Sequence, residues 1–181
     1  MRFNPVYILL SLATVCAITL TSCFNDDNPN YKDYSEWREQ NLQYITDAER
    51  ETADGKPVYE KLVPEWEKSV YTLIRWHNER SKERGLTPIS NSTVDVKYTL
   101  TNISGDTIDS SSSFRCRPSN MVTGFWLALT NMEPGDSVTT IVPYNAGYGE
   151  HSYSSILPYS TLIFTIKLDS IVAYQSLPWR N

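Results

Sequence analysis

The strict alternation in LIFTIKLD, residues 162–169, is the feature that most constrains the fold. Apolar side chains occupy the even positions and mostly polar ones the odd positions. Successive side chains of an extended chain point to opposite faces, so this period of two predicts a strand with one buried face. The stretch VDVKYTLT, residues 94–101, has the same pattern. We expect two long strands that belong to one half-buried sheet.

The other elements follow from periodicity and from turn residues. Residues 34–50 have a broad apolar side and predict a helix capped by Ser35. The apolar positions 122, 125, 126, 129 and 132 predict a short amphipathic helix. Strands are expected at 69–76 and 136–142, and a short return strand at 107–109. This order of strands, one short helix and further strands favours an α+β fold, with the helix laid across an antiparallel sheet.

The N-terminal stretch predicts a bacterial lipoprotein signal. Arg2 precedes an apolar run, residues 6–20, that is too short for a comfortable bilayer span and typical of a signal-peptide core. The run ends in Leu-Thr-Ser-Cys at 20–23, which resembles the lipobox of bacterial lipoproteins. That resemblance implies that Cys23 is lipidated and becomes the mature N-terminus. The alternative is a plain secretory signal with a chance cysteine.

Composition and missing motifs exclude several classes of function. The net charge is −5 and no basic cluster occurs, which argues against nucleic acid as a partner. The chain has no phosphate-binding loop, dinucleotide fingerprint or serine-nucleophile elbow. No spacing of Cys and His suits zinc. We therefore expect no metal and no cofactor, and we expect Cys116 to be a small core residue rather than a nucleophile.

From Val94 to Val172 the chain resembles the FKBP-type peptidyl-prolyl cis-trans isomerases. Five segments carry the resemblance in the family's order: VDVKYTL, SGDTIDSS, VTGFWLALTNMEPGD, PYNAGYG and ILPYSTLIF. The resemblance implies an antiparallel curved sheet wrapped around one short α-helix. The N-terminal helix is similar to the extension of bacterial lipoprotein members of the family.

The resemblance also implies a pocket, residue by residue. The expected catalytic residues are Tyr98, Asp109, Val122, Phe125, Tyr148 and Phe164. The expected further substrate contacts are Ile108, Phe114, Met121, Tyr153, Ile156 and Leu157, with the aliphatic tip of the flap assigned to Ile156 or Leu157. The Val122 N–H and the Tyr148 hydroxyl would bind the peptide. Tyr148 also stands out by itself, because a loop aromatic between two glycines has no packing pattern to explain it.

These expectations divide the chain and assign it a function. The predicted segments are a signal peptide (1–22), a tether (23–33), an N-terminal helical extension (34–67), the isomerase domain (68–176) and a tail (177–181). The predicted activity is rotation of X–Pro bonds in exported proteins, which are the expected partners. The expected location is the bacterial cell envelope, on a membrane through a lipid anchor. We favour the outer membrane, with the domain facing the periplasm or the cell surface.

Two departures from the family pattern leave alternatives open. Phe125 stands where the family has tryptophan, and Ile108 where it has phenylalanine. The chain could therefore be a slow isomerase, or an FKBP-fold binding module or chaperone without useful turnover. A third alternative is an unrelated β-rich surface-binding lipoprotein whose match to the motifs is fortuitous.

Overall fold

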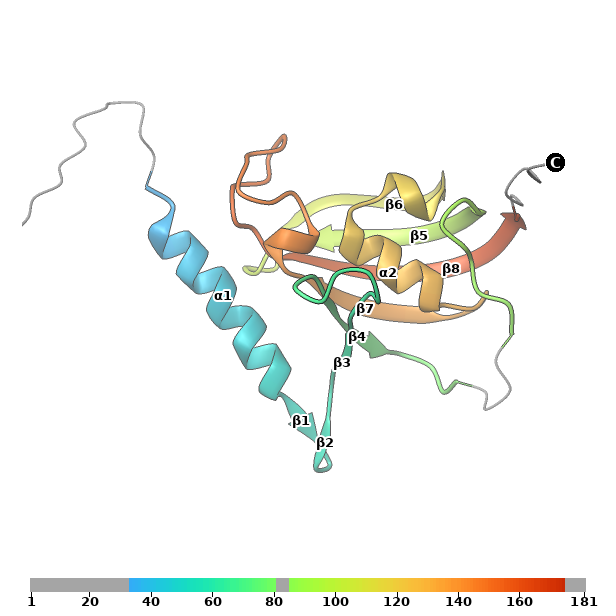
Figure 1. Ribbon diagram of the computed structural model, residues 1–181, viewed down its shortest axis with the longest axis horizontal. Coiled ribbons are helices and arrows are strands. Elements are labelled where there is room, and N and C mark those ends of the chain that lie inside the picture. Colours follow the sequence, from blue (N-terminus) through green and yellow to red (C-terminus); the bar gives the residue numbers. More distant parts are fainter. Residues whose placement is uncertain (1–32, 81–84, 175–181) are drawn as a thin grey trace, which may run out of the picture. The chain divides into compact units, whose positions relative to one another are not determined.

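The alternating stretches form two neighbouring strands of a six-stranded antiparallel sheet (Figure 1). The computed structural model describes residues 33–80 and 85–174. The strands are β3 (Glu60–Leu62), β4 (Thr72–Trp76), β5 (Thr93–Thr101), β6 (Thr107–Cys116), β7 (Ser137–Val142) and β8 (Leu162–Ala173). They pair in the order β3-β4-β7-β8-β5-β6. The two strands with the clearest alternation, β5 and β8, lie side by side, so their apolar faces form one surface.

Helix α2 (Thr123–Asn131) packs on that apolar surface. Phe125, Leu129 and Met132 are fully buried together with strand residues such as Val138 and Ile166. The start of the helix touches the sheet so closely that a Cβ on Gly124 would lie 2.3 Å from Val142 Cγ1. Only glycine allows this approach, which brings the first turn of α2 against β7.

Helix α1 (Ser35–Arg50) packs on the opposite face. Ile45 and Ala48 form a second buried cluster with Leu73 and Ile141. Neighbouring residues in a strand point to opposite faces. Ile141 therefore faces α1, while the adjacent Val142 faces α2. A small hairpin of β1 (Thr52–Ala53) and β2 (Lys56–Pro57) follows α1 and leads into β3.

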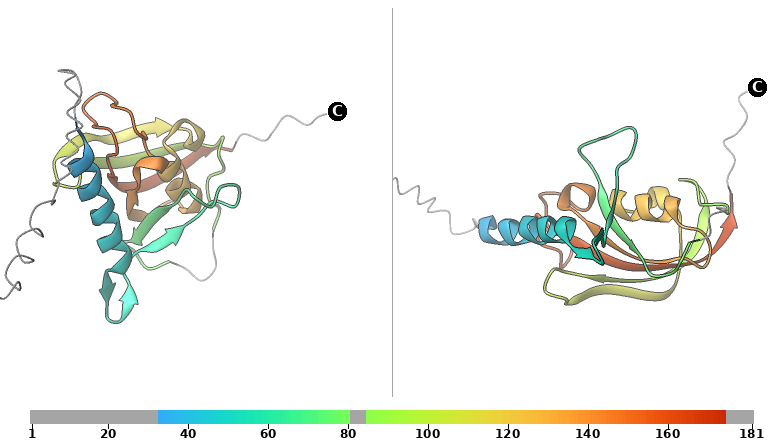
Figure 2. Two further views of the ribbon diagram at one scale, coloured as in Figure 1. Left: turned by 60° about the vertical axis from the view of Figure 1, so that its left-hand side comes forward. Right: turned by 90° about the horizontal axis from the view of Figure 1, so that it is seen from below.

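The connection from β3 to β4, residues 63–71, stands out from the sheet beside α2 (Figure 2). Two short 3-10 helices complete the fold, η1 (Pro118–Asn120) before α2 and η2 (Tyr144–Ala146) after β7. Both lie directly next to segments that are expected to line the pocket.

The α+β prediction is confirmed, with three differences in detail. The return strand predicted at 107–109 continues to Cys116, because its serine-rich part pairs with β5. Strand β3, in a stretch with no clear pattern, is added at the sheet edge. Ser35 is the first residue of α1 rather than its cap. Its backbone N–H donates to Asp33 Oδ1 at 2.8 Å.

The predicted signal peptide, Cys23, most of the tether and the C-terminal tail lie outside the described residues. The domain boundaries therefore stay predictions. The segment 34–67 contains α1 but also β1, β2 and β3, so it is only partly helical. Among the described helices, none has the length and apolar character needed to cross a bilayer. Asp33–Asn181 form one compact unit that holds all the described elements.

Candidate active site

Four aromatic rings from four elements meet between α2 and the sheet. Tyr98 comes from β5, Phe114 from β6, Phe125 from α2 and Phe164 from β8. Ring centroids are 5.0 Å apart for Phe125–Phe164, 6.0 Å for Tyr98–Phe125 and 5.4 Å for Tyr98–Phe114. All three pairs are edge-to-face, the arrangement that the ring quadrupole favours. These rings form the floor and one side of the candidate site.

A tyrosine–aspartate pair lies at one edge of this cluster. The Tyr98 hydroxyl donates to Asp109 Oδ2 at 2.5 Å, from β5 to the neighbouring β6. Burial, and then the hydrogen bond to Asp109, raise the pKa of Tyr98 to about 12. The hydroxyl is therefore neutral at physiological pH and directed towards Asp109. Ile108, the neighbour of Asp109, packs against the aromatic cluster.

The start of α2 supplies the next wall. Met121 and Val122 are half-buried and pack on the cluster. Val122 precedes the helix with an extended backbone, φ −58° and ψ 149°, and its carbonyl accepts the Trp126 N–H at 3.0 Å. Amide groups in the first turn of a helix lack partners within the helix and carry its positive end. Within the described part of the chain the Val122 N–H has no hydrogen-bond partner, so it can bind a carbonyl.

The tyrosine-rich loop, residues 143–161 between β7 and β8, closes the site opposite α2. Tyr148 is half-buried against the cluster, and its ring stacks on Tyr153 at 4.3 Å with an interplanar angle of 7°. Gly149 has φ +73°, and its N–H donates to the Tyr144 carbonyl at 2.8 Å. Burial, followed by the nearby Tyr153 and Asp109, raises the pKa of Tyr148. The charge of Asp109 therefore contributes to the raised pKa of both Tyr98 and Tyr148.

The flap is the part of this loop that turns at Ser154, and its two candidate tip residues, Ile156 and Leu157, differ in burial. Backbone hydrogen bonds join Tyr153 and Ile156 in both directions, at 3.0 and 2.9 Å, around Ser154 with φ +53°. This tight turn directs Ile156 into the cluster, where it is 5% exposed, and leaves Leu157 outside at 42%. Of the two alternatives, Ile156 is packed in the cluster, and Leu157 is exposed to solvent.

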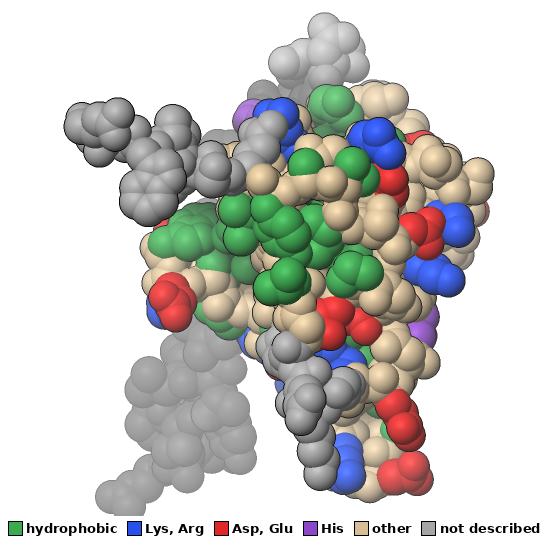
Figure 3. All heavy atoms as spheres, turned by 90° about the vertical axis from the view of Figure 1, so that its right-hand side faces the viewer, with side chains coloured by type: hydrophobic (Ala, Val, Ile, Leu, Met, Phe, Trp, Pro, Cys, Tyr) green, Lys and Arg blue, Asp and Glu red, His purple; other side chains and the backbone are tan. Residues whose placement is uncertain are grey.

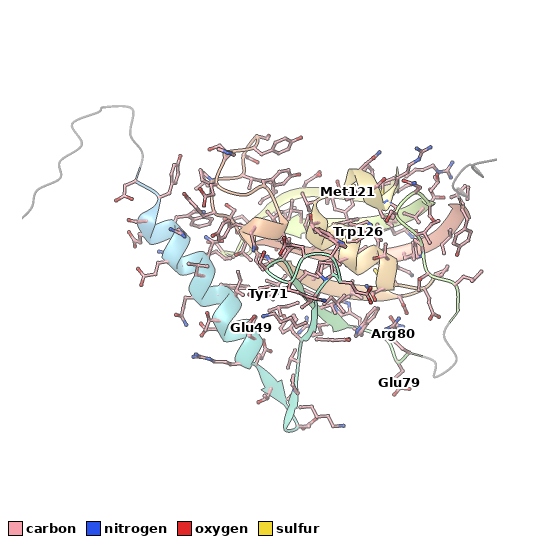
Figure 4. The ribbon with its side chains drawn as sticks, viewed as in Figure 1. Glu49, Tyr71, Glu79, Arg80, Met121 and Trp126 are labelled. Atoms are coloured by element: carbon pink, nitrogen blue, oxygen red, sulfur yellow. The ribbon has the colours of Figure 1, made fainter. Side chains whose placement is uncertain are left out.

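Eleven of the predicted residues thus meet at one place. Ten pack in or against the cluster or bind one of its members: Tyr98, Ile108, Asp109, Phe114, Met121, Val122, Phe125, Tyr148, Ile156 and Phe164. Tyr153 joins them through its stack on Tyr148. Figure 4 labels Met121, which lies just before the start of α2. Cys23 lies outside the described residues.

Helix α1 forms hydrogen bonds with the end of the flap, and these bonds were not predicted from the sequence. Trp37 Nε1 donates to Ser160 Oγ at 3.2 Å, and Asn41 Oδ1 accepts the Thr161 N–H at 2.6 Å. The signal was present, since Asn41 is a polar residue four positions from Trp37 and from Ile45 on an otherwise apolar helix side. Its burial, at 1% exposed, follows from that place.

Comparison with known proteins agrees with this geometry. Residues 85–169 match the family model of the FKBP-type peptidyl-prolyl cis-trans isomerases. Among solved structures, a peptidyl-prolyl cis-trans isomerase from Pseudomonas syringae pv. tomato superposes with a TM-score of 0.63 at 20% identity. That match covers 78% of this chain and 97% of that one. FkpA from Escherichia coli also superposes at 0.63 and 20% identity, with 77% of this chain and 61% of FkpA covered. No curated protein matched.

A curved antiparallel sheet that holds one short helix is the FKBP-like fold of these neighbours, and in this chain an aromatic cluster lies between the sheet and the helix. Residues 85–169 match the family of FKBP-type peptidyl-prolyl cis-trans isomerases, and the chain has an FKBP-like fold. The family match excludes the alternative of an unrelated β-rich lipoprotein.

Proposed function

We propose that this chain rotates X–Pro bonds in exported polypeptides by holding the twisted amide in the aromatic site. One observation carries the proposal: Tyr98, Phe125, Phe164 and Tyr148 converge from four separate elements beside the unpartnered Val122 N–H of the described structure. Apolar rings beside one available backbone donor suit a proline ring and the carbonyl that precedes it.

Catalysis in such a site needs no nucleophile. Rotation about a peptide bond must overcome a barrier of about 18–20 kcal/mol, which comes from amide resonance. The twisted amide has lost that resonance, so its carbonyl is less polar and tolerates a dry environment better. A site that binds the twisted form more tightly than either planar form lowers the barrier by differential binding.

Three polar groups would orient the peptide. The Val122 N–H would bind the carbonyl next to proline, and the Tyr148 hydroxyl a second carbonyl. Tyr98 and Asp109 satisfy one another, so their role is to present a fixed edge to the peptide in which the Tyr98 hydroxyl stays protonated. The pKa of Tyr98, about 12, keeps this edge unchanged across the physiological range of pH.

The closure of the site favours a second candidate function. Phe125 is 0% and Phe164 4% exposed, so a proline ring reaches them only when neighbouring side chains move. The Tyr148–Tyr153 stack and Ile156 form the wall best placed to move, because they belong to a loop rather than to the sheet. If this opening is rare, the protein would bind proline segments or act as a chaperone with little turnover.

The substrate and location remain part of the proposal. Lipidation at Cys23 would hold the domain at a membrane of the cell envelope, where slow X–Pro rotation limits the folding of exported chains. Mass spectrometry of the mature N-terminus tests this anchor. A diacylated or triacylated Cys23 supports it, whereas an unmodified chain cleaved elsewhere rejects it.

A protease-free prolyl isomerisation assay tests the activity. We expect the wild-type unit Asp33–Asn181 to accelerate the reaction, Tyr148→Phe to weaken it and Phe164→Ala to abolish most of it. No acceleration by folded wild-type protein rejects the enzyme, and suppression of aggregation in its place supports the chaperone. Acceleration that survives Phe164→Ala would place the active site elsewhere.

A further inference from the structure

Two tryptophans outside the aromatic cluster face one another beside α2. Trp66 belongs to the connection 63–71, and Trp126 to α2. Their ring centroids are 6.1 Å apart and the rings are tilted by 50°. With Ser90, Ser119 and Thr123 they line a cleft of about 270 Å³. This is several times the roughly 30 Å³ that one water occupies in the liquid, so the cleft has room for a side chain.

One wall of the cleft is fixed by hydrogen bonds. Trp126 Nε1 donates to Ser90 Oγ at 3.1 Å, and the Ser119 N–H donates to the Ser90 carbonyl at 2.9 Å. These bonds join η1, α2 and the segment 85–92. The opposite wall, Trp66, is 64% exposed. Because this wall is already fixed, a ligand that covers the exposed Trp66 indole would bury apolar area with little cost in ordering the wall.

The cleft and the candidate active site are lined by residues that are neighbours in the chain. Ser119 and Thr123 line it, and between them in the chain lie Met121 and Val122, which form the pocket wall. Figure 4 shows Met121 and Trp126 at the same end of α2. The connection 63–71 is also tied to the tyrosine-rich loop, because Asn145 Nδ2 donates to the Ser69 carbonyl at 3.0 Å. Both walls of the cleft are therefore joined to walls of the pocket.

Further apolar side chains extend from the fixed wall. Figure 3 shows hydrophobic side chains gathered at the middle of the face that carries the segment 85–92, with charged side chains around them. Leu86 and Ile89 of this segment are 74% and 48% exposed. The surface beside the cleft is thus suited to an apolar chain rather than to a charged one.

We propose that the cleft lined by the Trp66–Trp126 pair, Ser90, Ser119 and Thr123 is a secondary subsite for an apolar or aromatic side chain of the same polypeptide whose proline occupies the pocket. The inference rests on the proposed isomerase function. An extended chain advances about 3.3 Å per residue, so a peptide bound at the Val122 N–H passes Thr123 and Ser119 within a few residues of its proline. The indole faces supply the apolar contact, and the hydroxyls of Ser119 and Thr123 can bind the peptide backbone.

Peptides with one Ala–Pro bond in a glycine-rich background test this subsite. A single phenylalanine is moved through the three positions before and the three positions after that dipeptide, and kcat/KM is measured for each peptide with the unit Asp33–Asn181. We expect phenylalanine at one position to raise kcat/KM about tenfold over the all-glycine peptide, which corresponds to about 1.4 kcal/mol. The ratio between the two peptides should fall to near one in Trp66→Ala.

The ratio separates a subsite from a structural role. Both peptides are measured on the same sample, so a loss of folded protein in Trp66→Ala cancels. Leu42→Ala removes another exposed apolar side chain, 43% exposed, on α1 at the other face of the sheet, and should keep the wild-type ratio. A flat scan in wild type, or an unchanged ratio in Trp66→Ala, overturns the subsite while leaving the isomerase intact. If no peptide is accelerated, the isomerase proposal fails. The subsite is then tested by the dissociation constants of the phenylalanine peptide and the all-glycine peptide, measured by tryptophan fluorescence, and their ratio should again fall to near one in Trp66→Ala.

Discussion

The side chain of Asn41 in α1 accepts the backbone N–H of Thr161 at 2.6 Å, and both residues are buried. The Asn41 Nδ2 donates to the Trp37 carbonyl of its own helix at 2.8 Å. Thr161 lies immediately before β8 and three residues before Phe164. The Tyr159 N–H, two positions earlier, donates to the Gly149 carbonyl next to Tyr148. Helix α1 lies outside the matched family segment, yet it holds the end of the loop that forms the pocket wall.

We expect Asn41→Leu to destabilise the fold by about 1–3 kcal/mol, the usual cost of a buried donor left without a partner. Urea unfolding of the unit Asp33–Asn181 measures this, and the Thr161 amide should exchange its hydrogen faster. The matched control is Gln40→Leu, since Gln40 is exposed and its side chain donates to Glu36 on the same helix at 3.3 Å. Equal losses of stability in the two variants would mean that the bond to Thr161 contributes little.

Gly124→Ala should destabilise the protein, although alanine favours a helix by about 1 kcal/mol over glycine. The added Cβ would lie 2.3 Å from Val142 Cγ1, and overpacking of this kind costs about 1–3 kcal/mol. In the double variant with Val142→Ala the clash is gone. The loss in the double variant should therefore be smaller than the sum of the two single losses. Strict additivity in thermal or urea unfolding would show that α2 and β7 move apart easily.

The sequence was sufficient for the elements whose pattern is local. The alternation of β5 and β8 and the spacing of α2 determine which face is buried, so the sheet and its helix could be predicted, whereas the aromatic cluster was implied only by the resemblance to the family. Strand β3 and the second half of β6 could not. Serines have a low preference for strands, and Ser110 and Ser111 are extended because they pair with β5.

The finer geometry of the site depends on contacts that no pattern records. Ile156 and Leu157 are adjacent and equally apolar, and only the turn at Ser154 decides which one is buried. Trp66 lies in an irregular connection, and its pairing with Trp126 arises from the tertiary fold alone. Such contacts between distant segments depend on the tertiary fold and leave no local pattern in the sequence.

The Cys116 thiol should react slowly in the folded protein. Burial, and to a lesser extent Asp95, raise its pKa to about 11. At pH 8 the thiolate fraction is then on the order of a hundredfold below that of an ordinary thiol of pKa about 8.5. Cys116 is the only cysteine of the unit Asp33–Asn181, so alkylation followed by mass spectrometry reports on it alone. The urea-unfolded chain is the control, and equal rates in the two states would contradict the shift.

The same shift predicts how stability changes with pH. The pKa of Cys116 is higher in the folded than in the unfolded protein. The contribution of Cys116 to the free energy of unfolding is therefore complete below about pH 8.5 and is lost as the pH rises towards 11. Tyr98 acts in the same direction between its ordinary pKa of about 10 and about 12. Urea midpoints should therefore fall from about pH 9 upward. In Cys116→Ser the fall should begin about one unit later, and a fall that begins at the same pH would assign the loss to other groups.

Phe125→Trp tests whether the departure from the family pattern can be reversed. The Phe125 side chain is 0% exposed, with Phe164 at 5.0 Å and Tyr98 at 6.0 Å between ring centroids. A larger indole has no free space there, so we expect a loss of about 1–3 kcal/mol from overpacking and lower isomerase activity. Phe164→Leu removes part of the neighbouring ring, and Phe125→Trp should cost less in that background. A Phe125→Trp protein that is as stable as wild type would show that the cluster opens easily, and the pocket would then need no rare movement to admit proline.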